Sequence, residues 1–168
     1  MRLSHGFEPV FDASSRVLIL GSFPSVQSRE NGFYYGHMRN RFWPLLADIF
    51  ADTMPVTIAE KQDFLLRHGV ALWDVVQSCE IEGSSDASIR DVIPNDVPRI
   101  LADAPIARIL TNGRTADTLY RRFLQPLTGI EAICLPSTSP ANAAWSMKKL
   151  RDAWEPVLNA ACISTGCY

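Results

Sequence analysis

The sequence lacks the features that mark membrane-spanning and exported proteins. No apolar run approaches the ~20 residues that a helix needs to cross a bilayer. Residues 1–6 contain no apolar segment of the kind that a secretory signal requires. We therefore expect a cytoplasmic protein. Its 168 residues suit a single domain over 1–168 with one core at about residues 14–158, and we expect a monomer.

The sequence also lacks the cysteine spacing of a metal site or a disulfide framework. Of its four cysteines only Cys162 and Cys167 lie near each other, and no pair has the two-residue gap of a zinc or redox motif. In a reducing compartment such cysteines are free thiols. We therefore predict free thiols and no metal or other cofactor.

There is no excess of positive charge, which counts against a nucleic-acid partner. Sixteen Lys and Arg residues face eighteen Asp and Glu residues, a net charge of −2, whereas nucleic-acid-binding domains are usually basic overall. A small enzyme needs only a local positive face, and sixteen cations can supply one. The glycine-rich phosphate loops of nucleotide-binding proteins follow none of the expected strands, so a small-molecule nucleotide-binding protein is the weakest alternative.

Four short, continuous apolar segments are typical of strands that are buried on both faces. They cover residues 16–21, 70–76, 107–111 and 130–135. The helical patterns between them cover residues 40–50, 57–68, 114–123 and 143–158. The second helix begins with Thr57 and Glu60 at the spacing of a capping box. Strands that alternate with helices predict an α/β fold, a three-layer α/β/α domain around a central four-stranded, mainly parallel sheet.

Two of the loops that follow these strands are richer in functional side chains than a simple connection requires. The loop after the first strand runs from Gly21 to about Phe42, and loops longer than about a dozen residues are usually functional or disordered. Its many aromatic residues disfavour disorder. The loop after the fourth strand, residues 135–142, carries two prolines and three hydroxyls, and a turn before an N-capped helix is its simpler interpretation. The loop at Asn112 is likewise interpreted as a sharp turn.

Together these loops resemble the uracil-DNA glycosylase superfamily. The resemblance begins with Gly-x-x-Pro after the first strand and Pro-Ser after the last. The fuller motifs Gly-Ser-Phe-Pro, His-x-Arg-Asn-x-Phe-Trp, Leu-Trp-Asp-Val and Leu-Pro-Ser-Thr-Ser-Pro-Ala-Asn are similar to the hypoxanthine-DNA glycosylase branch, a relative of the mismatch-specific uracil and thymine glycosylases. The four motifs occur in the right order, and the resemblance covers about residues 14–158.

The sequence departs from the superfamily at both of its familiar catalytic positions. Phe23 stands where the mismatch-specific enzymes have a catalytic Asn, and Leu135 stands where the original uracil enzymes have a His. In the hypoxanthine branch the Asn of His-x-Arg-Asn takes the catalytic role, which the resemblance assigns here to Asn40. An amide can orient a water without being a strong base. The alternative role for Asn40 is that of a helix N-cap.

The resemblance also assigns a base pocket. Tyr35 matches the aromatic position on which relatives stack the flipped base, a contact that contributes roughly 1–3 kcal/mol, although Tyr34 beside it fits the same position. Asp74 lies near the residue with which relatives read a base edge, and a carboxylate, which only accepts, suits N1–H of hypoxanthine. A capping or structural aspartate is the alternative for Asp74. The predicted base-binding residues are Ser22, Phe23, Tyr35 and Asp74.

DNA contacts are expected around the rim of this pocket. Hydroxyls of the fourth loop would bind phosphates or the minor groove, and nearby cations, including Arg41, would form a positive surface. Each of these cations taken alone is better interpreted as a solvated surface charge. The predicted DNA-binding residues are Ser137, Thr138, Ser139, Arg39 and Lys148.

The resemblance thus implies a monofunctional DNA glycosylase of base excision repair. Such an enzyme flips a deaminated base out of double- or single-stranded DNA and hydrolyses its N-glycosidic bond. Hypoxanthine is the expected base, with uracil and xanthine as further candidates. Two alternatives stay open: a uracil-specific glycosylase, and a relative that binds damaged DNA without cutting it.

Overall fold

A four-stranded parallel sheet forms the centre of the fold. In the computed structural model, which describes residues 2–82 and 88–163, its strands are ordered β3-β2-β6-β7. They are β2 (Val17–Gly21), β3 (Val70–Asp74), β6 (Arg108–Asn112) and β7 (Ala132–Leu135). Every neighbouring pair is parallel. The predicted central sheet is therefore confirmed.

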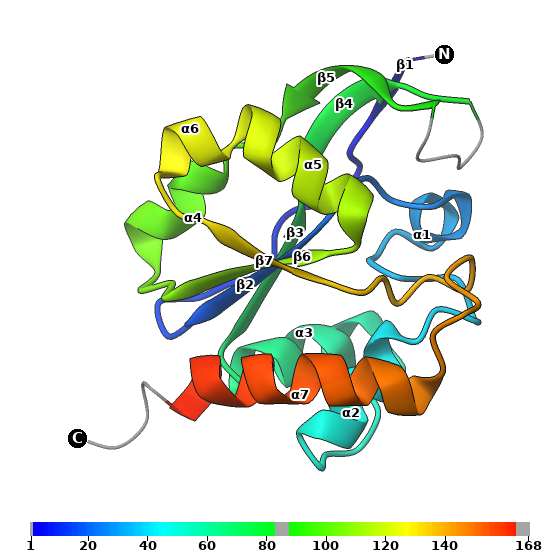
Figure 1. The fold of residues 1–168 in the computed structure, drawn as a ribbon, viewed down its shortest axis with the longest axis vertical. Coiled ribbons are helices and arrows are strands. Elements are labelled where there is room, and N and C mark those ends of the chain that lie inside the picture. The colour runs from blue at the N-terminus through cyan, green and yellow to red at the C-terminus, as the bar shows by residue number, and fades with distance from the viewer. Residues whose placement is uncertain (1, 83–87, 164–168) are drawn as a thin grey trace.

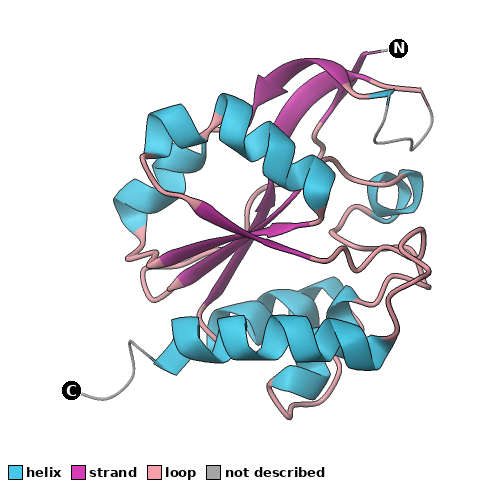
Figure 2. Ribbon diagram, viewed as in Figure 1, coloured by secondary structure: helices cyan, strands magenta, loops and turns pink. Residues whose placement is uncertain are grey.

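Helices cover both faces of this sheet, which explains why its strands are apolar throughout. One face carries α2 (Phe42–Ile49), α3 (Ile58–Arg67) and α7 (Met147–Ile163) (Figure 1). The other carries α4 (Val97–Asp103), α5 (Arg114–Phe123) and α6 (Gln125–Thr128). All residues of β2 and β3 are buried. The predicted three-layer α/β/α arrangement is confirmed (Figure 2).

The predicted helices all form, with one difference at the start of the last. In α3 the Thr57 hydroxyl accepts from the backbone N–H of Glu60, whose carboxylate accepts from the backbone N–H of Thr57, so the capping box is confirmed. Helix α7 begins at Met147 rather than at residue 143, because the chain before it forms turns in which the N–H of Asn142 donates to Ser139. It continues to Ile163, past the predicted start of a loose tail at about residue 160, and residues 164–168 lie outside the described part of the chain.

A second sheet, antiparallel and three-stranded, is a feature that the apolar patterns do not predict. Its order is β1-β4-β5, with β1 (Arg2–Ser4), β4 (Val76–Glu80) and β5 (Arg90–Pro94). The strand expected over 70–76 ends at Asp74, and after Val75 the chain continues as β4 in the other sheet. Most residues of β1 and β5 are exposed or half-buried, so these strands carry no apolar run. The short helix α1 (Val26–Asn31) is also absent from the sequence-based prediction.

The described residues bear on two expectations from the composition, which concern membrane-spanning helices and free cysteines. Across 2–82 and 88–163, no helix has both the length and the apolar character that crossing a bilayer requires. Cys79 in β4 and Cys134 in β7 are free thiols, as predicted. Cys167 lies outside the described residues.

The last helix is joined to the loop that follows β7. Trp154 in α7 is fully buried, and its indole N–H donates to the carbonyl of Pro136 at 2.9 Å. Removing the indole N–H takes away the only protein donor that the described residues offer to the Pro136 carbonyl, which costs about as much as a hydrogen bond. Trp154 therefore stabilises both the core and the position of this loop.

We predict that Trp154→Phe lowers the free energy of unfolding by about 2–4 kcal/mol, because it leaves the Pro136 carbonyl unpaired and opens a cavity. Equilibrium urea unfolding measures the loss. Trp145→Phe is the matched control, since Trp145 is only partly buried and its indole N–H has no hydrogen bond among the described residues. Equal losses in the two variants would contradict the role of the Trp154–Pro136 bond.

Candidate active site

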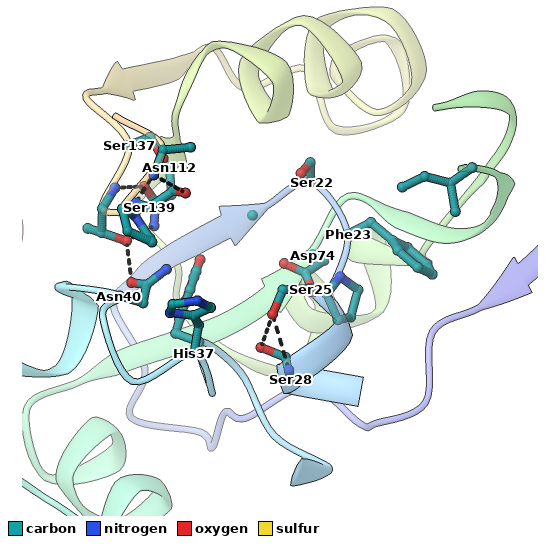
Figure 3. A pocket seen from close by; sticks show the side chains of 17 residues that line it. Ser22, Phe23, Ser25, Ser28, His37, Asn40, Asp74, Asn112, Ser137 and Ser139 are labelled. Atoms are coloured by element: carbon teal, nitrogen blue, oxygen red, sulfur yellow. Dashed lines mark hydrogen bonds between the residues drawn. The ribbon is translucent and has the colours of Figure 1, made fainter. Parts of the chain in front are cut away.

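A pocket of about 310 Å³ opens where the four parallel strands end (Figure 3). The carboxyl ends of parallel strands meet at one edge of a sheet, and ligand sites of α/β folds form there. Both long loops contribute to its wall. Its lining residues are Gly21, Ser22, Phe23, Pro24, Ser25, Ser28, Tyr35, His37, Asn40, Asp74, Ile81, Asn112, Ser137, Thr138, Ser139, Pro140 and Ala141.

Asn40 lies on the wall of this pocket with its amide held in one orientation. Its Oδ1 accepts from Thr138 Oγ1 at 2.9 Å and from the backbone N–H of Phe42 at 3.0 Å. The second bond is a capping interaction, because Phe42 begins α2. Two donors occupy both lone pairs of the carbonyl oxygen. The Nδ2 group, which has no partner among the described residues, is left for the pocket (Figure 3).

The orientation of the Asn40 amide is set by a chain of hydrogen bonds that starts at Asn112. The backbone N–H of Thr138 donates to Asn112 Oδ1 at 3.0 Å, so Asn112 must present its Nδ2 to the Thr138 hydroxyl, which accepts at 3.0 Å. That hydroxyl then has its own proton left to donate to Asn40 Oδ1. A backbone N–H, which can only donate, thus determines the direction of every bond in the chain.

Thr138 is consequently not available to DNA in the way that the sequence predicts. It is fully buried, and its hydroxyl both accepts and donates inside the protein. Its neighbours Ser137 and Ser139 are only partly buried, and their hydroxyls accept from the backbone N–H groups of Ser139 and Ala141. Among these three hydroxyls, a phosphate contact therefore stays a prediction for Ser137 and Ser139 alone.

The Arg41 guanidinium is bound to backbone carbonyls, whereas the sequence suggests a cation of an open positive surface. The guanidinium donates to backbone carbonyls of the loop after β7, including that of Ser139 at 2.9 Å and that of Asn142 at 3.1 Å. The carbonyls of Thr138 and Trp145 accept from it as well. Four of the five N–H groups of a guanidinium are thereby used. Arg41 holds two loops together rather than forming an open positive surface.

The other two predicted cations are exposed. Arg39 has no side-chain hydrogen bond among the described residues, and its backbone N–H donates to His37 Nδ1. Lys148 Nζ lies 3.0 Å from Asp152 Oδ2, with both side chains mostly exposed. A surface pair of this kind contributes ~0–1 kcal/mol, so it does not withhold Lys148 from a ligand.

Asp74, at the end of β3, is a buried carboxylate with a histidine behind it. Its Oδ2 accepts from Nε2 of His5 at 2.8 Å, and the two side chains are 5% and 2% exposed. Its Oδ1 has no hydrogen bond among the described residues, and Asp74 lines the pocket whereas His5 does not. The carboxylate is therefore the part of this pair that a ligand can reach.

Gly21 makes room for Asp74 and for the hydroxyl of Tyr35. A Cβ at this position would lie 2.3 Å from Asp74 Oδ1 and 3.0 Å from the Tyr35 hydroxyl oxygen. Both polar atoms therefore converge on the bare Cα of Gly21. The Tyr35 hydroxyl is buried and has no hydrogen-bond partner in the described residues. Its burial and the charge of Asp74 raise the pKa of Tyr35 far above its usual range, so it stays protonated.

The two adjacent tyrosines have different environments. Tyr34 belongs to the core, with its hydroxyl donating to the carbonyl of Glu8, whereas Tyr35 lines the pocket. The Tyr35 ring stacks on Phe42, with centroids 4.1 Å apart. Its backbone has φ of 54°, a strained value for a residue other than glycine and one that is often found at functional sites. Phe23 and Ser22, also predicted here, lie in the same wall.

Sequence reasoning missed two residues that belong to this site. His5 stands near the start of the chain in a segment without a motif, and only the second sheet brings it to Asp74. Asn112 was interpreted as part of a turn, and that turn exists, since Gly113 has φ of 98° and precedes α5. The sequence contained one signal for Asn112: it stands at the carboxyl end of a predicted central strand, where ligand sites of α/β folds form.

Potential metal ligands do not cluster in the part of the chain that the structure describes. Within 2–82 and 88–163, no three His, Cys, Asp or Glu side chains come together as a metal site requires. The absence of a cofactor stays a prediction from the sequence.

Comparison with known proteins identifies several relatives of this chain. Residues 8–158 match the model of the family described as the uracil DNA glycosylase superfamily. A hypoxanthine DNA glycosylase from Methanosarcina acetivorans is 36% identical over 157 residues, which are 92% of this chain and 98% of the relative. A hypoxanthine DNA glycosylase from Methanosarcina barkeri is 34% identical over 151 residues, 89% of this chain and 94% of the relative.

A solved structure shares the fold. The solution NMR structure of a proposed uracil DNA glycosylase from Methanosarcina acetivorans superimposes with a TM-score of 0.81 at 33% identity. The match covers 96% of this chain and 99% of that chain.

We predict that Gly21→Ala destabilises the protein by about 1–3 kcal/mol, because the new methyl group must displace the Asp74 carboxylate from its bond to His5. Gly6→Ala is the matched control, since a Cβ there meets nothing within 4 Å. Thermal and urea unfolding of both variants test the prediction. A Gly21→Ala variant as stable as Gly6→Ala would show that Asp74 can move without cost.

Proposed function

This chain belongs to the uracil DNA glycosylase superfamily, and we propose from that membership that it hydrolyses the N-glycosidic bond of hypoxanthine in DNA. It is a DNA glycosylase for deaminated bases, and uracil and xanthine are further candidate substrates. The proposed enzyme acts as a cytoplasmic monomer on double- or single-stranded DNA and uses no metal or cofactor. The observation that carries the proposal is the fixed amide of Asn40 on the wall of the pocket at the strand ends.

Hydrolysis of the glycosidic bond of a base in DNA requires a pocket. A base stacked in a duplex cannot be attacked at its glycosidic bond, so the nucleotide has to rotate out of the helix into the protein. Bond cleavage leaves positive charge on the sugar and negative charge on the departing base. A catalyst therefore needs a positioned water at the sugar and hydrogen-bond donors at the base.

We assign the catalytic role to Asn40. Because its Oδ1 is already engaged, the amide acts through Nδ2, which carries two N–H bonds. One can hold the oxygen of the attacking water and the other can stabilise negative charge on the departing base. Donors that are oriented before the reaction contribute more than mobile ones, because they need no reorganisation. The Asn112–Thr138 chain supplies that orientation.

The capping role of Asn40 does not compete with this assignment. The same residue caps α2 through Oδ1 and faces the pocket through Nδ2. Neither of the two familiar catalytic positions supplies a polar group, since Phe23 is an apolar part of the wall and Leu135 is buried and does not line this pocket.

We assign recognition of the base to Asp74, with Phe23, Ser22 and the ring of Tyr35 as the surrounding wall. Asp74 Oδ1 is an acceptor that suits N1–H of hypoxanthine. Adenine presents a lone pair at N1 instead, and a carboxylate facing it stays unpaired, which costs about 1–3 kcal/mol. On the outside we propose that Arg39, Lys148, Ser137 and Ser139 contact the DNA backbone.

We predict that Asn40→Ala lowers the single-turnover rate of inosine excision about 100-fold or more, as expected when one oriented donor is removed from a reacting site. The assay uses a labelled duplex with one inosine, followed by alkaline cleavage of the abasic product. Asn159→Ala in α7 is the control, because Asn159 is not among the pocket residues. Near-native excision by Asn40→Ala would refute the assignment, and an inactive wild-type protein would refute the proposed function itself.

The hydrogen-bond chain gives a second prediction. Thr138→Val keeps the shape of the side chain but removes one of the two donors to Asn40 Oδ1. The amide is then held by the backbone N–H of Phe42 alone, and excision should fall about tenfold or more because Nδ2 is less precisely oriented. Thr138→Ser retains the hydroxyl and should stay within about threefold of the wild type. Single-turnover rates are compared with unfolding curves for both variants. Equal excision by the Val and Ser variants would mean that the chain does not orient Asn40.

A further inference from the structure

His5 does not line the pocket but bonds Asp74, which does. The residue follows β1, and its ring lies behind Asp74 with only 2% of its side chain exposed. A histidine in the core more often serves packing alone, but here its Nε2 bonds a carboxylate that lines the pocket. The surroundings of His5 indicate how it positions the Asp74 carboxylate.

The proton position on His5 follows from its neighbours. The backbone N–H of Phe7 donates to Nδ1 at 3.4 Å, so Nδ1 keeps its lone pair and Nε2 carries the hydrogen that Asp74 Oδ2 accepts. A charge-assisted bond of this kind is stronger than one between neutral groups. It leaves Asp74 Oδ1 as an acceptor in the pocket.

Aromatic rings surround the imidazole of His5. The imidazole lies 4.8 Å from the ring of Phe7 and 6.3 Å from that of Phe23, between centroids. Tyr34 and Trp73 pack against it at 5.8 Å and 6.5 Å. The ring therefore cannot turn away, and water cannot take its place as the donor to the carboxylate.

The Tyr35 hydroxyl places a hydrogen-bond donor beside Asp74 on the pocket side. The hydroxyl of Tyr35 is buried, donates its hydrogen to no described residue and lies beside the same Gly21 Cα as Asp74 Oδ1. Buried polar groups in folded proteins are nearly always paired, and those left unpaired often await a ligand. The pocket floor thus holds one acceptor and one donor side by side.

We propose, on the basis of the glycosylase function proposed above, that His5, Asp74 and Tyr35 form a unit that reads a lactam edge, a ring N–H beside a carbonyl. Asp74 accepts from the ring N–H, Tyr35 donates to the carbonyl oxygen, and His5 is the positioning residue that holds Asp74 in place. The substrate class is then every base that carries this edge.

This edge is what deamination creates. Hypoxanthine, uracil and xanthine all present a ring N–H beside a carbonyl, whereas adenine and cytosine present a ring lone pair beside an amino group. Adenine and cytosine therefore place a lone pair against the acceptor Asp74 and an N–H against the donor Tyr35. Guanine and thymine share the lactam edge, so other parts of the pocket must reject them.

The test of His5 uses single-turnover excision of inosine by a matched pair of variants. His5→Phe keeps a flat ring but removes the donor, and we expect the maximal rate to fall about tenfold or more. His5→Gln places an N–H near the Nε2 position and should recover most of that loss. Equal rates for the Phe and Gln variants, with similar unfolding curves, would overturn the role of His5.

A double-mutant cycle shows whether His5 acts through Asp74. If it does, His5→Phe/Asp74→Asn excises inosine no more slowly than Asp74→Asn alone, because the carboxylate that His5 positions is already gone. Fully multiplicative losses would place His5 in a separate, structural role and contradict the unit.

Tyr35→Phe tests the donor, since it keeps the ring and removes the hydroxyl. We expect the maximal rate to fall about tenfold, with little change in the enzyme concentration at half-saturation, because the bond strengthens as charge builds on the base. A variant with the wild-type maximal rate would remove Tyr35 from the unit.

A second measurement covers the case in which His5→Phe does not fold. In the wild-type protein, the NMR signal of the His5 Nε2–H should shift when a duplex with a non-hydrolysable 2′-fluoro inosine analogue is added, and not with an undamaged duplex. An unchanged signal on saturation would overturn the inference. Failure of the wild type to excise any deaminated base would instead refute the proposed function, so the two failures are distinguishable.

Discussion

The site depends on one buried contact between two loops, the hydrogen bond from Thr138 to Asn40. These residues are 98 positions apart in the chain, and their bond joins the loop after β2 to the loop after β7. It forms because Asn112, at the end of β6, fixes both the backbone and the hydroxyl of Thr138. Apart from Asn40 Nδ2, which faces the pocket, the side-chain groups that link these three residues are paired, which is the condition under which buried polar groups rigidify a structure instead of destabilising it.

Arg41 reinforces the same junction from the other side. It follows Asn40 directly, and its guanidinium binds the carbonyls of the loop that also holds Thr138. A loop without regular structure has many carbonyls with no partner in a sheet or helix, and a planar group with five donors can bind several at once. One cation of a slightly acidic protein is thereby used for structure, and the remaining basic residues must supply any positive surface toward DNA.

The floor of the pocket shows how a carboxylate can be buried at acceptable cost. Isolated charge inside a protein is strongly unfavourable unless a donor stabilises it. His5 provides that donor and leaves one oxygen of Asp74 unpaired beside Gly21. The unpaired Tyr35 hydroxyl lies at the same place. A ligand edge that offers an N–H and a carbonyl oxygen would pair with both groups.

The sequence by itself determined the scaffold and most of the site. Continuous apolar runs predicted the strands of the parallel sheet because a strand covered on both faces has no room for polar side chains. The motifs at the strand ends then identified Asn40, Tyr35 and Asp74, which the structure brings into one pocket.

Only the tertiary structure decided the partners of those residues. Neither the Asn112–Thr138–Asn40 chain nor the His5–Asp74 pair has a sequence signal, because each joins residues from separate elements whose distance depends on how sheets and loops pack. The same holds for Arg41 and Thr138, which look like surface groups in the sequence and are engaged inside the fold. Periodicity reports which face of an element is buried, but the direction of a hydrogen bond depends on which donor and which acceptor the folded chain places within 3 Å.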